Sequence, residues 1–304
     1  MLILFKGLLM KPVIQRAYWL ITLFLVIVMA PSLFADERQK GLLWQIDKPG
    51  LTPSYLFGTI HSEDARVNRL PFEIRSRFER ADSVSLEVQM DLTTMLKVAK
   101  AMFFKGEASL DQLISKELYD KTVKALLKYD MPTMVVNKLK PWAVVVTLSM
   151  PPTQTGEVLD LQLYRKAQQL KIPTYGLEKV EEQLQVFEDI PLTDQITLLR
   201  DTLKYIDKMP IIFDQLHELY LARDLTALMR FSITYMRNSS DNQALMDAFY
   251  KRVVDDRNIR MVNRMEQRLQ EGNAFIAVGA LHLPGEKGLL KLLQNRGYQV
   301  SVVY

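Results

Sequence analysis

The segment FIAVGALH, residues 275–282, repeats a pattern that first occurs in YLFGTIH, residues 55–61. Each segment is a short apolar run of strand character that ends in Gly-x-x-His, and together they use two of the three histidines in the chain. Glycine near the end of a strand lets the backbone turn sharply or approach a neighbour closely. We therefore expect the two runs to lie side by side in one sheet and to direct His61 and His282 into one cleft.

Other short segments rich in β-branched and aromatic residues predict the rest of this sheet. They are LLWQID (42–47), SVSLEV (83–88), IPTYGLE (172–178) and YQVSVVY (298–304), and the first should form a hairpin with the strand over 54–60. Helical spacing is present over 109–130, 156–170, 193–209, 210–224 and 241–271, with a short last helix before Gly297. The sequence thus predicts an α/β (α+β) fold, a mixed central sheet flanked by helices with a large helical middle region.

The first 35 residues have the layout of a secretory signal peptide. Basic residues precede an apolar run of 14 residues, 17–30, and the segment closes with the small-residue end SLFA. We predict cleavage after Ala35, a single mature domain over 36–304, and a periplasmic or secreted protein, with Met1 and Met10 both candidate starts. The alternative is an uncleaved segment that anchors the chain in the inner membrane, although 14 residues are short for a span.

The net charge of the chain depends on this segment, which contributes Lys6, Lys11 and Arg16 and no acid. Its removal leaves 36 of the 39 basic residues and all 35 acidic residues, which gives a net charge near +1. A net charge this small does not indicate nucleic-acid binding. Apolar residues make up 48% of the sequence and charged residues 24%, as in globular proteins. The sequence has no cysteine, which excludes disulfides, thiolate metal sites and cysteine nucleophiles.

Two glutamates are candidate partners of the histidines, because each closes a strand-like segment. Glu87 follows the apolar run of SVSLEV, and Glu178 closes PTYGLE. An acid within an apolar run is costly to bury unless it is paired or coordinated, and carboxylates join imidazoles in many metal sites. The alternative to a metal site is that each glutamate faces solvent on a half-exposed strand and that each histidine is a packed or capping residue.

The remaining polar candidates are expected to be structural or solvated. His217 lies at helical spacing among leucines and should be structural, while Asp160, Arg165, Arg257 and Arg260 lie on helices whose charged faces are usually solvated. The sequence has no G-x-S-x-G, which argues against a serine nucleophile elbow, and no H-E-x-x-H, which argues against the common zinc-protease helix. It also lacks the P-loop and G-x-G-x-x-G motifs of nucleotide sites.

From about residue 42 to 304 the chain resembles the TraB/GumN family, to which the Tiki metalloproteases of Wnt regulation are related. The resemblance rests on the two G-x-x-H segments, the glutamate-bearing SVSLEV, LKPWAV, GEVLDLQLYRKAQQLKIPTYGLEKVEEQL and DDRNIRMVNRM. It implies the fold shared with erythromycin-esterase-like, ChaN-like and Tiki-like proteins, a mixed sheet flanked by helices.

The resemblance also implies roles for individual residues. His61 and His282 match the motif histidines, Glu87 the family glutamate and Arg257 the family arginine, and Glu178 falls in the GLE block. In Tiki-like members such residues are thought to form a divalent-metal peptidase site.

Two imidazoles and one or two carboxylates suit Mn, Co, Fe or Zn. We accordingly expect a metal held by His61, Glu87 and His282, with Glu178 as general base and Arg257 as the anion-stabilising group. The expected substrate is a peptide or protein, and membrane contact is expected only through an uncleaved signal segment. The alternative function is a non-catalytic peptide- or metal-binding protein of the cell envelope.

Overall fold

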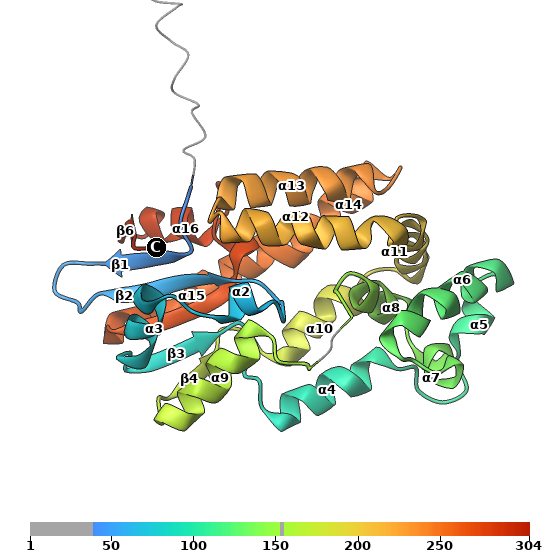
Figure 1. Ribbon diagram of the computed structural model, residues 1–304, viewed down its shortest axis with the longest axis horizontal. Helices are drawn as coiled ribbons and strands as arrows, with labels where there is room; N and C mark the ends of the chain where they lie inside the picture. The colour runs from blue at the N-terminus through green and yellow to red at the C-terminus, as the bar shows by residue number, and fades with distance from the viewer. Residues whose placement is uncertain (1–38, 153–154) are drawn as a thin grey trace, which may run out of the picture. The chain divides into compact units, whose positions relative to one another are not determined.

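A six-stranded mixed sheet is the frame of the computed structural model, which describes residues 39–152 and 155–304 (Figure 1). The strands lie in the order β4-β3-β5-β2-β1-β6. They are β1 (Leu43–Asp47), β2 (Ser54–Thr59), β3 (Ser83–Leu86), β4 (Thr174–Gly176), β5 (Ala274–Gly279) and β6 (Gln299–Val302). Each predicted strand segment overlaps one of these strands, so the predicted mixed sheet is confirmed. The predicted signal peptide lies outside the described residues.

The two G-x-x-H strands are neighbours at the centre of the sheet. β2 and β5 pair in parallel, with Leu56 opposite Ile276 and Thr59 opposite Gly279. β3 pairs in parallel with β5 on one side and with β4 on the other. β1 pairs antiparallel with β2, as the predicted hairpin requires, and β6 pairs antiparallel with β1. Strands β4, β3, β5 and β2 therefore share one direction, and their carboxyl ends meet at one edge of the sheet.

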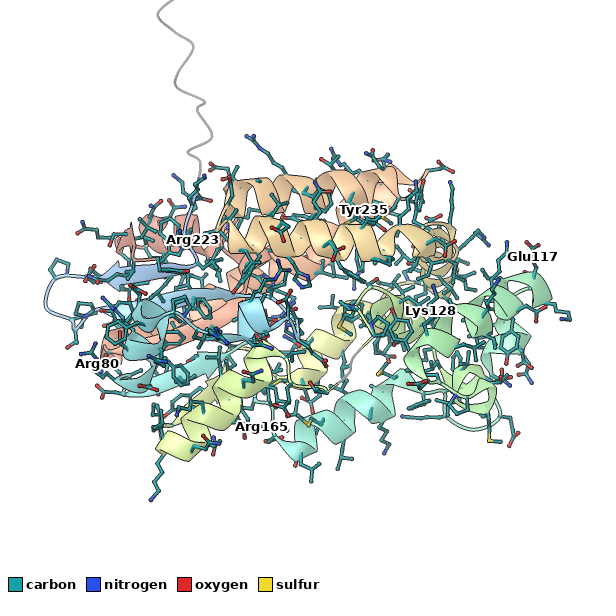
Figure 2. All side chains as sticks on the ribbon, in the orientation of Figure 1. Arg80, Glu117, Lys128, Arg165, Arg223 and Tyr235 are labelled. Carbon is teal, nitrogen blue, oxygen red and sulfur yellow. The ribbon has the colours of Figure 1, made fainter. Side chains whose placement is uncertain are left out.

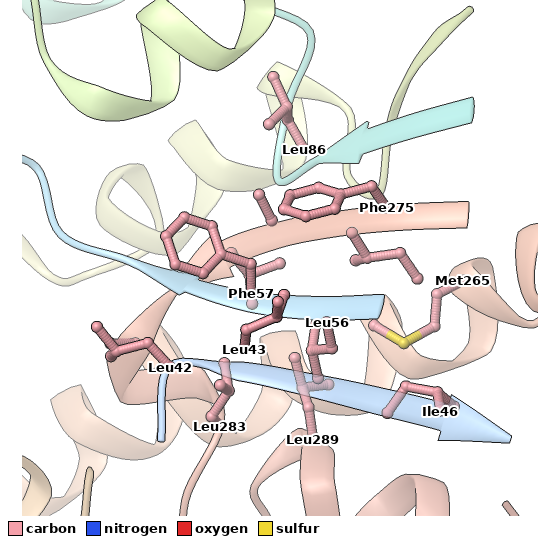
Figure 3. Close-up of a cluster of buried hydrophobic side chains, with 14 of the residues drawn as sticks. Leu42, Leu43, Ile46, Leu56, Phe57, Leu86, Met265, Phe275, Leu283 and Leu289 are labelled. Atoms are coloured by element: carbon pink, nitrogen blue, oxygen red, sulfur yellow. The ribbon is translucent and has the colours of Figure 1, made fainter. Parts of the chain in front are cut away.

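Helices cover both faces of this sheet, because its central strands are apolar on both sides. Figure 1 shows α3 and α9 in front of the sheet and α15 behind it. Phe275 of β5 packs edge-on against Phe78 of α3, with ring centroids 5.2 Å apart, and Figure 3 shows Phe57 and Met265 in the same core. The sheet-covering helices are α2 (Ala65–Asn68), α3 (Phe72–Glu79), α9 (Leu159–Leu170), α15 (Asp256–Glu271) and α16 (Leu289–Asn295).

The middle of the chain is helical and builds a second core. Leu110, Leu148 and Leu199 are fully buried in it, separately from the sheet core. The helices of this region are α4 (Leu92–Met102), α5 (Leu110–Leu113), α6 (Lys116–Leu126), α7 (Thr133–Lys138), α8 (Pro141–Leu148), α10 (Val180–Glu188), α11 (Leu192–Lys204), α12 (Met209–Leu221), α13 (Leu225–Asn238) and α14 (Gln243–Tyr250). Gln39–Tyr304 forms one compact unit around the two cores.

Two of the predicted helices differ in detail from the structure. The helix expected over 109–130 is divided into α5 and α6, because Ile114 is extended and the Ser115 hydroxyl accepts a hydrogen bond from the amide of Leu118 to begin a new helix. The helix expected over 241–271 contains a π-helical turn, Lys251–Asp255, between α14 and α15. No helix within the described residues is long and apolar enough to cross a membrane.

Candidate functional site

Four candidate residues follow the carboxyl ends of the four parallel strands. In the order of the sheet they are Glu178 after β4, Glu87 after β3, His282 after β5 and His61 after β2. The β5 end tightens into a 3₁₀ turn, Ala280–His282. Residues that are far apart in the sequence thus reach one edge of the sheet, the place where ligands bind in α/β folds.

Glu87 lies at the centre of this group and its two oxygens have different partners. Oε1 accepts a hydrogen bond of 2.7 Å from the amide of Gly279 and lies 3.7 Å from His282 Nε2. Oε2 accepts from the guanidinium of Arg257 and from Gln183 Nε2 at 3.1 Å. Burial alone would raise the pKa of Glu87, but the charge of Arg257 and the hydrogen bond from the Gly279 amide hold that pKa well below its usual range.

His282 is buried and its ring is oriented by Asn258 of α15. Nδ1 lies 2.7 Å from Asn258 Oδ1, and because an amide oxygen only accepts, Nδ1 carries the proton of this hydrogen bond. Asn258 is itself held by a bond of 2.8 Å from Nδ2 to the carbonyl of Lys287. Burial is the main cause that lowers the pKa of His282, to about 4. The ring is therefore neutral, and Nε2, which carries the lone pair, lies 3.7 Å from Glu87 Oε1.

His61 also lies beside an acceptor side chain, the carboxylate of Asp160, but this contact is an ion pair rather than a well-aligned hydrogen bond, and His61 lies nearer to solvent. Its Nδ1 lies 2.9 Å from Asp160 Oδ2, and 52% of its side chain is exposed. Asp160 Oδ1 accepts a hydrogen bond of 2.8 Å from Thr59, whereas Oδ2 has no well-aligned hydrogen-bond donor. The Asp160 charge raises the pKa of His61, although solvent around the half-exposed ring limits the size of this effect.

Glu178 is enclosed by two arginines of α15. Oε2 accepts from Arg257 Nε at 2.8 Å and Oε1 accepts from Arg260 at 2.7 Å, and the Glu178 side chain has no exposed surface. Gln183 Nε2 also donates to Glu178 Oε2, at 3.2 Å, and so bridges the two glutamates. Both oxygens of Glu178 are therefore occupied, which does not suit the general-base role that the sequence suggested. Arg260, expected to be solvated, is instead an ion-pair partner of this buried acid.

The chemistry of these donors fits a divalent metal, but the structure gathers only part of a ligand set. Each histidine has its Nδ1 engaged by a second side chain, which is the usual support of a metal-binding imidazole. Metal–ligand bonds are about 2.0–2.1 Å long, so two atoms bound to the same ion can lie at most about 4.2 Å apart. The distance of 3.7 Å between Glu87 Oε1 and His282 Nε2 is within this limit. Among the described residues, however, no three His, Asp or Glu side chains are close enough to hold a metal together. His61 therefore stands apart from the Glu87–His282 pair.

A pocket of about 340 Å³ opens beside His61 and revises the expectation for His217. His217 of α12 is partly exposed and lines this pocket with His61 and Asp64, so it is not enclosed by the helix packing that its spacing suggested. The lining of the pocket also includes apolar residues, among them Pro151 and Val158.

Two residues that orient the histidines were not identified from the sequence. Asp160 was expected on a solvated helix face, but it is buried, because Thr59 and His61 supply its partners across the sheet edge. Asn258 directly follows Arg257, and that adjacency is the one signal that could have found it. Arg165 is solvated as expected, and Figure 2 shows it extending from α9, where it pairs with Glu157.

The fold and this strand-end site agree with a known family of α/β proteins. The family model for TraB/PrgY/gumN matches residues 42–302, and the chain belongs to this family. Among curated proteins it is similar to metalloprotease TIKI2 of Danio rerio, with 25% identity over 88% of this chain and 62% of that protein. It is similar to metalloprotease TIKI1 of Homo sapiens with 23% identity over 88% of this chain and 62% of that protein.

A bacterial relative matches over nearly its whole length. The protein YbaP of Shigella flexneri is 24% identical over 86% of this chain and 97% of its own. By contrast, this chain spans less than two thirds of the zebrafish TIKI2 and TIKI1 proteins. No solved structure matches the chain, so the named relationship to erythromycin-esterase-like and ChaN-like folds stays a prediction.

Proposed function

We propose that this chain is an exported metal-dependent peptidase in which Glu87 and His282 form the preassembled part of a divalent-metal site and His61 joins them only when the ion binds. The observation that carries the proposal is the second contact of each histidine: Nδ1 is engaged by Asn258 or Asp160, so Nε2 is the nitrogen left for a ligand. The similarity to Tiki metalloproteases supports the same chemistry. When bound, such an ion supplies Lewis-acid polarisation of a peptide carbonyl and makes water more acidic.

The side chains around this ligand set would then have separate tasks. Arg257 holds Glu87 through Oε2, which leaves Oε1 directed toward His282. Glu178 in turn holds Arg257, and we propose it as a positioning residue because both its oxygens are occupied. The pocket beside His61 would accept a substrate side chain, because its lining combines apolar residues such as Pro151 and Val158 with the polar His217.

A non-catalytic binder is the second candidate, and one observation favours it. No group of three ligands is assembled in the described part of the chain, and Glu87 is already neutralised by Arg257. A protein that captures a peptide or an ion without hydrolysis needs no fully formed metal site.

The test combines metal analysis with a cleavage assay. The protein is purified from the cell envelope, its metal content is measured, and a peptide library is incubated with the protein before and after chelation. Cleavage that disappears on chelation and returns with Mn, Co, Fe or Zn is the expected result. Retained metal or bound peptide without any cleavage would contradict the peptidase and leave the binder.

Export is proposed on the layout of residues 1–35 and is tested separately. The N-terminal sequence of the protein recovered from the periplasm should begin after Ala35. A protein that remains in the cytoplasm and begins at Met1 or Met10 would contradict export.

A further inference from the structure

A groove lies between α3 and α9, two helices that Figure 1 shows in front of the sheet, and is here called the α3–α9 groove. Its volume is about 920 Å³, more than twice that of the pocket beside His61. Its lining combines side chains of the sheet core with amide side chains, which can both donate to and accept from the peptide groups of a ligand. The core residues are Phe78, Leu159 and Leu163, and the amides are Asn68, Gln162 and Gln169.

The α3–α9 groove is long in the direction of α9. Its lining residues on this helix run from Leu159 to Gln169, a distance of about 15 Å at the helical rise of 1.5 Å per residue. An extended peptide advances about 3.3 Å per residue, so this length matches about four to five residues. A single small anion would fill little of this space.

The charge of the groove lining is positive. The charged lining residues are Arg69, Arg75, Arg165, Lys166, Glu79 and Glu157. Arg165 is paired with Glu157, and Lys166 lies 4.0 Å from Glu79. Arg69 and Arg75 are exposed, and neither guanidinium has a hydrogen bond or an ion pair with any described residue. Two cations therefore remain for a ligand, and arginine binds carboxylates through paired hydrogen bonds.

The acids that are near the groove residues in sequence do not cancel this charge. Glu63, Asp64 and Asp160 already have partners within the described chain. Glu73 is exposed on α3, but two residues along a helix correspond to a rotation of about 200°, so Glu73 and Arg75 lie on different faces of α3. The two unpaired arginines are thus a net charge of the groove itself.

We propose that the α3–α9 groove binds an extended acidic peptide segment whose carboxylates pair with Arg69 and Arg75. The length of the groove selects a segment rather than a small anion, and the amide side chains suit the backbone of that segment. The two unpaired cations select acidic over basic side chains.

The groove is a neighbour of the strand-end site. Glu157 lines the groove, and Thr155 and Val158 of the same segment line the pocket beside His61. A peptide held in the groove therefore lies next to that pocket. The inference deepens the proposed function, on which it rests for the choice of a peptide. It is tested by binding rather than by cleavage, so a protein that hydrolyses nothing could still confirm it.

The test measures binding to the protein purified from the cell envelope, in the presence of a chelator. The probe is a fluorescein-labelled peptide, Gly-Asp-Leu-Asp-Leu-Gly, followed by fluorescence anisotropy, and its partner has Asn in place of each Asp. We expect the acidic peptide to bind more tightly than the Asn peptide, with an affinity that falls as salt is raised. Arg69→Gln/Arg75→Gln should weaken binding of the acidic peptide roughly tenfold or more, because charge-assisted hydrogen bonds are lost.

Matched controls separate the groove from the general charge of the protein. Lys124→Gln/Arg200→Gln removes two exposed cations from α6 and α11 and should bind the acidic peptide as the unmodified protein does. Gln169→Trp narrows the groove without a change of charge and should also weaken binding, whereas Gln112→Trp on α5 should not. Circular dichroism establishes that every variant is folded.

A reversal of the charge gives the sharpest outcome. Arg69→Glu/Arg75→Glu should prefer a peptide with Lys in place of each Asp over the acidic peptide. Equal binding of the acidic and Asn peptides, or unchanged binding in Arg69→Gln/Arg75→Gln, would overturn the proposal. Displacement of the labelled peptide by inorganic phosphate at the same concentration as by unlabelled peptide would show a small-anion site and would also overturn it.

Discussion

At the scale of single residues, the two motif histidines have unequal structural roles. His61 is half-exposed, whereas His282 is buried against Asn258. If both hold the metal, His61→Ala and His282→Ala should each abolish turnover. Their stabilities should differ, because His282→Ala leaves the buried Asn258 Oδ1 without a donor, a loss of about 1–3 kcal/mol.

Thermal unfolding and the cleavage assay check this pair together. His61→Ala should melt close to the unmodified protein, because 52% of the His61 side chain is exposed. Full turnover in both variants would make the paired motifs structural.

The buried acid Glu178 is predicted to be a positioning and stabilising residue. Glu178→Gln leaves Arg257 and Arg260 without their shared counter-charge in a buried place, and breaking such a pair costs about 3–5 kcal/mol in the free energy of unfolding. Urea denaturation measures the change. Glu182→Gln, which breaks the more exposed pair with Arg264, is the matched control and should cost about 1 kcal/mol or less. A Glu178→Gln variant of normal stability that has lost turnover would favour the general base instead.

At the scale of elements, the glycines of the two motifs allow different contacts. A Cβ at Gly58 would lie 3.2 Å from Ala280 Cα and Cβ and from Leu283, whereas a Cβ at Gly279 would lie 3.2 Å from Glu87 Oε1. Gly58→Ala should therefore force β2 and the 3₁₀ turn apart and lower the free energy of unfolding by about 1–3 kcal/mol.

Gly279→Ala should cost less stability than Gly58→Ala but more metal affinity. The new methyl group would displace Glu87 Oε1, which is the end of a side chain and a proposed metal ligand, rather than backbone atoms. Urea denaturation and metal titration of both variants test the difference. Equal losses of stability would contradict it.

The contact between α10 and α15 predicts a pH dependence of stability. Hydrogen bonds from Arg264 lower the pKa of Glu182 to about 2, from about 4.3 in an unfolded chain. A depressed pKa stabilises the fold above pH 4.3, and this contribution is lost as the pH falls from 4.3 toward 2. The difference in unfolding free energy between the unmodified protein and Glu182→Gln should shrink over that window. A difference that is constant from pH 7 to pH 2 would exclude this linkage.

At the scale of the whole molecule, two cores predict unequal local stability. Strand β5 lies at the centre of the sheet core, whereas α5 and α7 are short helices around the second core. Short helices depend on packing for their stability and open at lower cost. Native-state hydrogen exchange should show β5 amides exchanging only through global unfolding and amides of α5–α7 exchanging through smaller openings.

Leu148→Ala tests the independence of the two cores. It removes a fully buried side chain of the second core, at a cost of about 2–5 kcal/mol, and should lower protection there while leaving β5 unchanged relative to global unfolding. Equal loss of protection in both regions would show that the two cores unfold as one.

Periodicity and composition in the sequence determined the strands, the helical middle and the mixed sheet, because alternation and apolar runs are local properties of the chain. The G-x-x-H repeat and the two strand-end glutamates likewise identified four side chains that the structure brings to one edge of the sheet. Only the tertiary structure decided their partners. Asp160 and Asn258 orient the histidines from helices distant in sequence, and Arg257 and Arg260 enclose Glu178. Burial and ion pairing depend on which surfaces meet after folding, and a one-dimensional pattern does not contain that information.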